Sequence, residues 1–184
     1  MKIISGKYKG RILKGYMIDG TRPTMDRVKE SVFAMIQDYI KDSIFLDLYS
    51  GTGNIGIEAI SNGSKKAYLV DNNMVAIKTI KENINMLKID NIDVIKEDAI
   101  ACLNNFINTG IKFDIIFLDP PYKEEFALDA IEKISNLQLL KDDGIIIIET
   151  DEPERDINRI NNMNINYKIY DLRKYGRVSL IFLK

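Results

Sequence analysis

Four consecutive residues, Asp119-Pro120-Pro121-Tyr122, carry the side chains of this sequence that are best suited to chemistry. They follow the apolar stretch DIIFL, residues 114–118, which is typical of a buried strand. A carboxylate beside a proline carbonyl can accept both hydrogens of an exocyclic amine on a base, which localises the lone pair on nitrogen. Proline rings stiffen such a loop, and the ring of Tyr122 can stack on a base turned out of its helix. The tetrad therefore predicts a site that holds an amino nitrogen as a nucleophile.

A rigid turn that only ends the strand, with Tyr122 packed on the surface, is the structural alternative for this tetrad. The chemical interpretation is favoured because the acid stands at a strand end, downstream of a glycine-rich loop. In open α/β sheets, ligands gather at the carboxyl ends of strands, so the tetrad and the loop should face one cleft.

The glycine-rich loop is LDLYSGTGNIG, residues 46–56, which leaves a strand and enters a helix. Glycine lets the backbone turn tightly and lets a ligand approach, while the helix N-terminus offers N–H groups to an anion. A loop of this kind binds NAD as readily as S-adenosylmethionine, so it does not separate the two cofactors. The residues that we expect against the cofactor here are Tyr49, Ser50, Gly51, Thr52 and Gly53.

Acids at three strand ends add to this prediction. Asp71, beside Asn72, ends the second strand, where a carboxylate can accept both ribose hydroxyls and where we expect few structural duties for an acid. Asp47 could organise the glycine loop or face the cationic methionine end of a cofactor. Asp98, beside Ala99, could accept an adenine amino group, although capping the following helix is the alternative. Asp47 and Asp98 favour S-adenosylmethionine, with S-adenosylhomocysteine as the product.

The elements that must position these residues alternate between apolar strands and helices from Ser43 onward, which predicts a parallel sheet wrapped by helices. The expected strands are 44–48, 67–71, 92–96, 114–119 and 145–150, and the expected helices are 54–62, 73–87, 99–107 and 125–135. Two last strands, 167–172 and 177–183, are joined by only four residues and must therefore pair antiparallel. This pattern predicts an α/β fold of the class I methyltransferase type, with a mostly parallel seven-stranded sheet ending in an antiparallel hairpin.

An N-terminal extension precedes this core, so we expect an appendage over 1–42 and a catalytic domain over 43–184 in one compact unit. Glycines between residues 2–4 and 11–13 predict a β-hairpin. Thr24 is a candidate cap for a helix with apolar positions Val28, Val32, Ile36 and Tyr39.

The extension is also basic, because the first 30 residues hold 8 Lys and Arg against 3 Asp and Glu in a chain of net charge −1. We expect RNA phosphates to be bound by Lys7, Lys9, Arg11 and Lys14. Arg22 and Thr24 are expected to help close the site over cofactor or base; a solvated charge and a helix cap are their alternatives.

Composition excludes several other classes of protein. The 184 residues contain no histidine and one cysteine, which excludes internal disulfides, histidine-ligated metals and the usual serine or cysteine triads. We expect no metal, and Cys102 is interpreted as a packing residue. No apolar run is long enough to span a bilayer, and the N-terminal MKIISGKYKGR does not resemble an export signal, so we expect a cytoplasmic protein. We also expect a monomer.

With these residues in place, the sequence resembles the bacterial 16S ribosomal RNA guanine-N2 methyltransferase family of the RsmD type. The resemblance rests on LDLYSGTGNIG, VDNN at 70–73, EDA at 97–99, LDPPY at 118–122 and TRPTMDRVKESVF at 21–33, and spans nearly the whole chain. It implies transfer to N2 of a guanine in 16S rRNA, within an assembled or assembling small ribosomal subunit. The sequence departs from the family at Ser5, often glycine, and at Asp71, often glutamate.

Three alternatives remain at this point. A DNA or RNA adenine-N6 methyltransferase would use the same tetrad, but such enzymes usually carry an added recognition region for which this chain has little room. A NAD-binding oxidoreductase would explain the glycines and Asp71, yet it leaves the tetrad without a role. A noncatalytic RNA-binding module could keep the same fold.

Overall fold

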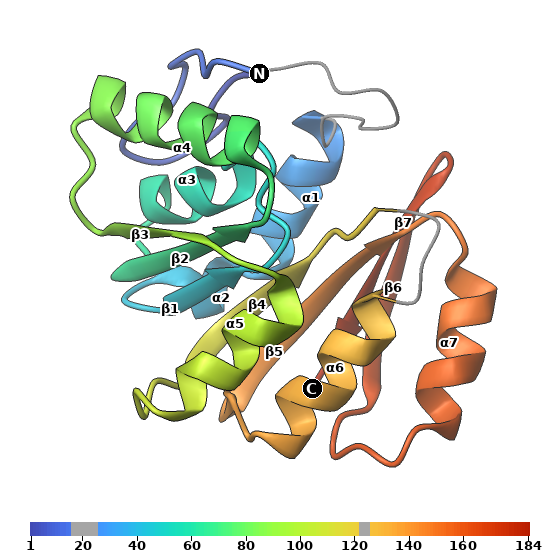
Figure 1. The fold of residues 1–184 in the computed structure, drawn as a ribbon. Helices are drawn as coiled ribbons and strands as arrows, with labels where there is room; N and C mark the ends of the chain where they lie inside the picture. The colour runs from blue at the N-terminus through green and yellow to red at the C-terminus, as the bar shows by residue number, and fades with distance from the viewer. Residues whose placement is uncertain (16–25, 122–125) are drawn as a thin grey trace.

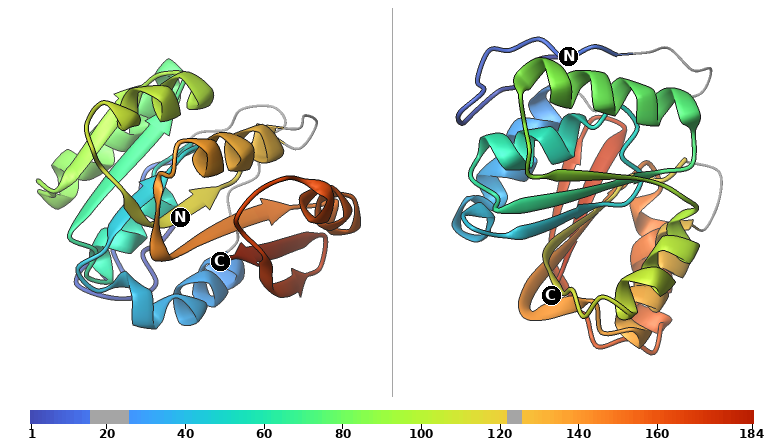
Figure 2. Two further views of the ribbon diagram at one scale, coloured as in Figure 1. Left: turned by 90° about the horizontal axis from the view of Figure 1, so that it is seen from below. Right: turned by 60° about the vertical axis from the view of Figure 1, so that its left-hand side comes forward.

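The structure is a computed structural model that describes residues 1–15, 26–121 and 126–184. Its described part contains one seven-stranded sheet in the order β3-β2-β1-β4-β5-β7-β6, with helices on both faces (Figures 1 and 2). The strands are β1 Ile44–Asp47, β2 Lys66–Asp71, β3 Ile92–Lys96, β4 Phe113–Leu118, β5 Leu140–Thr150, β6 Ile169–Tyr175 and β7 Val178–Leu183. The helices are α1 Asp26–Met35, α2 Gln37–Ile40, α3 Asn54–Ser61, α4 Met74–Leu87, α5 Ala99–Ile107, α6 Phe126–Asn136 and α7 Pro153–Asn162.

The strands β3, β2, β1, β4 and β5 run parallel, whereas β7 lies antiparallel between β5 and β6. The predicted fold class is therefore confirmed. Parallel order places the carboxyl ends of β1, β2, β4 and β5 along one edge of the sheet, which we call the carboxyl edge.

Alternation along each central strand builds two cores. Phe45, Phe117 and Ile147 face the layer of α1, α3 and α4, while Ile116 and Ile146 face the layer of α5 and α6. All five side chains are essentially inaccessible to solvent. Helices thus cover both faces of the sheet. Side chains on both faces of each central strand are buried, which explains why the sequences of these strands are continuous apolar runs.

The N-terminal extension differs from its prediction. The expected hairpin strands reduce to one isolated antiparallel bridge between Lys2 and Ile12. Its apolar residues Ile3 and Leu13 nevertheless belong to the same core as the sheet, on the α1 side. The expected single helix is two, because Ile36 leaves the helical conformation, with φ −102° and ψ 11°, and separates α1 from α2.

The C-terminal part also differs in detail. Helix α7 was not expected, because its sequence PERDINRINN offers few apolar residues. The turn before β7 is shorter than the predicted four residues, since β6 continues to Tyr175 and the chain reverses at Gly176, whose φ is +66°. Within the residues that the structure describes, no helix is both long and apolar enough to cross a membrane.

Candidate active site

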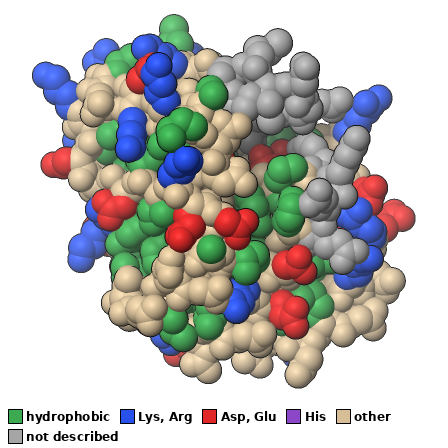
Figure 3. Space-filling view, viewed as in Figure 1, with side chains coloured by type: hydrophobic (Ala, Val, Ile, Leu, Met, Phe, Trp, Pro, Cys, Tyr) green, Lys and Arg blue, Asp and Glu red, His purple; other side chains and the backbone are tan. Residues whose placement is uncertain are grey.

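Three buried or half-buried carboxylates meet at the carboxyl edge. Asp47 ends β1 and is 2% exposed, Glu149 lies near the end of β5 and is 4% exposed, and Asp119 directly follows β4. Asp47 pairs with Phe117, and Leu118 pairs with Ile148, so Asp119 and Glu149 stand at the same level of neighbouring strands. Figure 3 shows Asp and Glu side chains on the floor of a hollow, near the place where Figure 1 draws these strand ends.

Burial and mutual repulsion change the acidity of this cluster. Burial is the largest cause that raises the pKa of Asp119 well above its usual range, followed by the charges of Glu149 and Asp47. Burial also raises the pKa of Asp47 to about 7, against a lowering by the Gly56 N–H; the charge of Asp71 raises it further. These carboxyl groups therefore bind protons more tightly than free carboxyl groups do, and a bound cation would favour their ionised forms.

Asp47 also shapes the glycine loop, as the first of its two predicted roles requires. Its Oδ2 accepts the backbone N–H of Gly56 at 3.0 Å, and its carbonyl accepts the Ser50 hydroxyl at 2.6 Å. Gly51 and Gly53 have φ of +52° and +77°, a region that glycine occupies without strain. A Cβ on Gly56 would lie 2.4 Å from Leu69 Cδ1, so this glycine is needed for close packing of α3 on β2.

The expectation that Asp71 has few structural duties is wrong. Its Oδ2 accepts the N–H of Gly51 at 2.8 Å, and its Oδ1 accepts the N–H of Asn73 at 2.8 Å. The carboxylate thus joins the loop after β1 to the loop after β2. It is only partly buried, and each oxygen has a further lone pair, so it can still accept a hydroxyl.

Asp98 caps helix α5, as its structural alternative proposes. The same oxygen, Oδ1, accepts the N–H groups of Ile100 at 3.0 Å and Ala101 at 3.1 Å, which leaves Oδ2 outside these bonds. The side chain is exposed, whereas the neighbouring Ala99 is buried. The cap and an adenine contact are therefore compatible on one carboxylate.

The other residues expected near a cofactor lie on the same edge. The Tyr49 hydroxyl donates to the carbonyl of Phe126 at 3.1 Å, and burial raises the pKa of this phenol. The Thr52 hydroxyl contacts Met1 Sδ at 3.4 Å, and Asn72 is exposed beside Asp71.

Of the tetrad after β4, Pro120 is buried and Pro121 is exposed. Tyr122 lies outside the described residues, as do Arg22 and Thr24 of the N-terminal extension. Cys102 is buried in α5, which confirms its interpretation as a packing residue.

The N-terminal segment that carries the basic residues lies beside α3 and α4 (Figure 1), with the N–H of Ser5 bonded to Glu58 of α3 and the N–H of Lys14 bonded to Asn83 of α4. The N–H of Lys7 donates to the carbonyl of Ser61 at 2.7 Å, at the end of α3 that lies away from the glycine loop. Lys9 and Arg11 are exposed, and Lys14 Nζ pairs with Glu82 at 2.9 Å. The structure therefore does not bring Lys7 to the carboxylate cluster.

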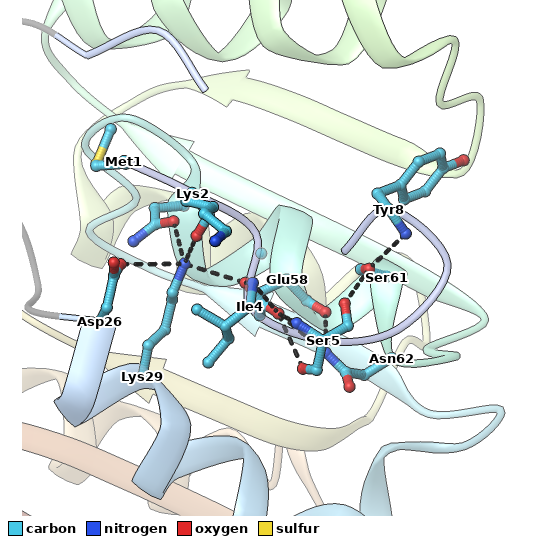
Figure 4. Close-up of polar contacts among 12 residues, drawn as sticks. Met1, Lys2, Ile4, Ser5, Tyr8, Asp26, Lys29, Glu58, Ser61 and Asn62 are labelled. Atoms are coloured by element: carbon cyan, nitrogen blue, oxygen red, sulfur yellow. Dashed lines mark hydrogen bonds and ion pairs between the residues drawn. The ribbon is translucent and has the colours of Figure 1, made fainter. Parts of the chain in front are cut away.

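The sequence analysis missed a buried ion pair beside the glycine loop (Figure 4). The Lys29 ammonium of α1 lies 3.0 Å from Glu58 Oε2 and 2.8 Å from Asn54 Oδ1, both on α3, and all three side chains are buried. Glu58 also accepts the N–H groups of Ile4 and Ser5. The pair thus ties the N-terminal segment and α1 to the helix that follows the glycine loop.

A sequence signal for this pair existed. Lys29 interrupts the otherwise apolar helical stripe of Val28, Val32 and Phe33, and Glu58 stands between Ile57 and Ala59 in an apolar helix. A charge of each sign on a buried face predicts that the two meet, because an unpaired buried charge is costly.

The whole chain is similar to a family of known proteins. The model of the family described as "Conserved hypothetical protein 95" matches residues 1–184. The YlbH protein of Bacillus subtilis is 41% identical over 152 residues, which cover 82% of this chain and 83% of that protein. The "Ribosomal RNA small subunit methyltransferase D" of Haemophilus influenzae is 34% identical over 154 residues, covering 83% and 79% respectively.

A solved structure also matches this chain over its whole length. The structure of the yhhF protein from Escherichia coli superimposes with a TM-score of 0.82 at 26% identity, covering 100% of this chain and 96% of that one. The match of the family model over the full chain, together with these identities and coverages, shows that this protein belongs to the Conserved hypothetical protein 95 family, as the RsmD-type resemblance predicted.

Proposed function

We propose that this protein transfers the methyl group of S-adenosylmethionine to the N2 amino group of a guanine in 16S rRNA. The observation that carries the proposal is the position of Asp119 and Pro120 at the same edge of the sheet as the loop of Gly51 and Gly53. Family relatives named for small-subunit ribosomal RNA methylation support the substrate.

The residues around the glycine loop fit this cofactor. Its positively charged methionine end suits a cluster in which Asp47 has a raised pKa, because a cation stabilises the ionised form. The Nδ2 donor of Asn54, buried at the start of α3, has no acceptor among the described residues and lies where a helix N-terminus favours an anion. Asp71 and Asp98 provide acceptors for hydroxyl and amino groups.

Asp119 and the Pro120 carbonyl would hold the two hydrogens of the amine and orient its lone pair. When bound, the cofactor supplies a methyl group on a sulfonium, and the electron pair of the broken C–S bond stays on sulfur. The nitrogen then gives up one proton, which Asp119 can accept because its pKa is raised. The protein acts mainly through alignment, which explains how a chain without histidine can be an enzyme.

The partner in this proposal is 16S rRNA in an assembled or assembling small subunit, and the protein acts as a cytoplasmic monomer without a metal. Methylation of adenine N6 is the second candidate, since Asp119 and Pro120 could hold that amine equally well. Specificity between the two bases must come from other side chains.

The experiment that tests this function uses small subunits from a strain that lacks the protein. Incubation with the purified protein and methyl-tritiated cofactor should label 16S rRNA, and mass mapping should find N2-methylguanosine at one nucleotide. N6-methyladenosine would select the second candidate. RNA binding without any transferred label would leave only a binding module.

Cofactor affinity should depend on pH through Asp47. Because the pKa of this acid is about 7 in the free protein, a bound cation must displace a proton below that pH. Binding should therefore be about tenfold weaker at about pH 6 than at about pH 8. Calorimetry at several pH values measures this, and Asp47→Asn should flatten the dependence. An unchanged slope in that variant would assign the pH dependence to another group.

The N-terminal cations should contribute affinity for RNA rather than catalysis. Replacing Lys7, Lys9 and Arg11 together by Ala should weaken RNA binding and reduce its salt dependence by about three phosphate contacts, with the rate at saturating RNA maintained. A control that removes Lys112, Lys133 and Lys168, which lie before β4, in α6 and before β6, loses the same charge outside the N-terminal extension. Equal salt slopes in both triple variants would show that these N-terminal cations make no contact with phosphates.

A further inference from the structure

Glu149 has no role in the transfer described above, although it lies beside the acid that holds the amine. Its strand neighbour Ile148 pairs with Leu118, so Glu149 and Asp119 occupy equivalent positions on adjacent parallel strands, which lie about 4.8 Å apart. Side chains at equivalent positions leave the sheet on the same face. Both carboxylates therefore lie on the face of α1 and α3, with Asp47.

The raised pKa of Asp119 also indicates that the two carboxylates lie close together. After burial, the charge of Glu149 is the largest cause that raises the pKa of Asp119. Glu149 is itself 4% exposed, at the end of the apolar run of Ile145 to Ile148. A carboxylate offers about four acceptor positions, so Glu149 can accept a hydrogen bond from a ligand in addition to contacts with its neighbours.

The chemistry of the two candidate bases differs at the atom next to the amine. Guanine carries a hydrogen on N1 beside its N2 amine, whereas adenine has an unprotonated, accepting N1 beside its N6 amine. A carboxylate facing N1 would attract guanine and repel adenine. Enzymes that act on a flipped base read this edge by hydrogen bonds.

We propose that Glu149 accepts the N1 hydrogen of the target guanine while Asp119 and the Pro120 carbonyl hold its N2 amine, and that Glu149 thereby selects guanine over adenine. The inference rests on the proposed function, and it identifies the side chain that sets the choice of base. Asp47 then remains for the cofactor, so each of the three carboxylates has a separate partner.

The test compares 16S rRNA transcripts, reconstituted into small subunits, that carry guanine or adenine at the mapped nucleotide. The wild-type protein should methylate guanine alone. Glu149→Gln replaces one acceptor oxygen by an NH2 donor, which suits the N1 of adenine. Transfer to guanine should fall about 10- to 100-fold, and transfer to adenine N6 should become measurable by mass analysis. Glu149→Ala should lose guanine activity without gaining adenine activity.

Controls separate this inference from folding and from the proposed function. The melting temperature, and its increase with S-adenosylhomocysteine, should stay close to wild type in Glu149→Gln, and Glu152→Gln makes the same chemical change on an exposed residue nearby. An unchanged ratio of guanine to adenine transfer in Glu149→Gln would overturn the inference alone. A wild-type protein that methylates neither base would instead overturn the proposed function.

Discussion

Asp119→Asn should reduce methyl transfer by about 100- to 1000-fold while binding of S-adenosylmethionine is largely maintained. The substitution keeps the size of the side chain but removes its charge and replaces one acceptor oxygen by a donor, so the amine is no longer held by acceptors alone. Single-turnover transfer of tritiated methyl groups to small subunits measures the rate, and calorimetry measures cofactor binding. Asp119→Ala should behave in the same way.

Stability should respond to the same substitution in the opposite direction. The pKa of Asp119 is higher in the folded than in the unfolded chain, so the folded state binds this proton more tightly. The stability that the proton confers is present below the unfolded pKa and is lost as pH rises through the folded pKa. A neutral Asn avoids that loss, and Asp119→Asn should unfold at the same or higher temperature near neutral pH.

The matched control is Asp114→Asn, which makes the same change on the same strand at the opposite edge of the sheet. Asp114 accepts the N–H of Ile44 and pairs with Lys141, away from the carboxylate cluster. This variant should keep full activity. Wild-type turnover in Asp119→Asn and Asp119→Ala would remove the amine-holding role from the tetrad.

Lys29→Met should lower the free energy of unfolding by about 3–5 kcal/mol, which is the usual loss when one partner of a buried ion pair is removed. The substitution leaves Glu58 charged and fully buried without its cationic partner; its remaining donors are the N–H groups of Ile4 and Ser5, the Ser5 hydroxyl and the Asn62 side-chain amide. Urea unfolding, followed by circular dichroism, gives the free energy.

The double variant Lys29→Met with Glu58→Gln should recover part of this loss, because no unpaired charge remains. An exposed control pair, Lys14→Met with Glu82→Gln, should change stability little, since solvent screens that contact. If Lys29→Met is as stable as wild type, the pair contributes nothing to holding the N-terminal segment on α3.

Most of the fold could be predicted because its core strands are buried on both faces and its main helices have one apolar face. The stretch FDIIFL of β4 admits almost no other interpretation between two turns. Helix α7 escaped prediction because its sequence is mostly polar, and one of its two buried side chains, Asp156, accepts the hydroxyl of Thr150. Such a helix is stabilised by contacts that only the folded chain creates.

Parts of the candidate site could be predicted where one short segment of sequence contains both the polar residue and the strand that places it at the carboxyl edge. Asp119 and the glycine loop are of this kind, since each follows its own strand. The position of Glu149 beside Asp119 depends on which strands are neighbours, which a single sequence does not state. The Lys29–Glu58 pair was indicated only by two opposite charges on apolar helix faces. The two hydrogen bonds that Asp71 accepts from Gly51 and Asn73 were not predicted. A side chain that accepts backbone N–H groups leaves no periodic pattern in the sequence.

The two hydrogen bonds of Asp71 also limit the exchange of aspartate for glutamate at this position. The short Asp71 side chain accepts the N–H groups of Gly51 and Asn73 at 2.8 Å each, so its length fits the distance between the two turns. A glutamate, longer by one methylene, could keep this spacing only if one of the two turns moved. The choice of aspartate here is therefore matched to the backbone of this chain, and a relative that carries glutamate must compensate in its turns.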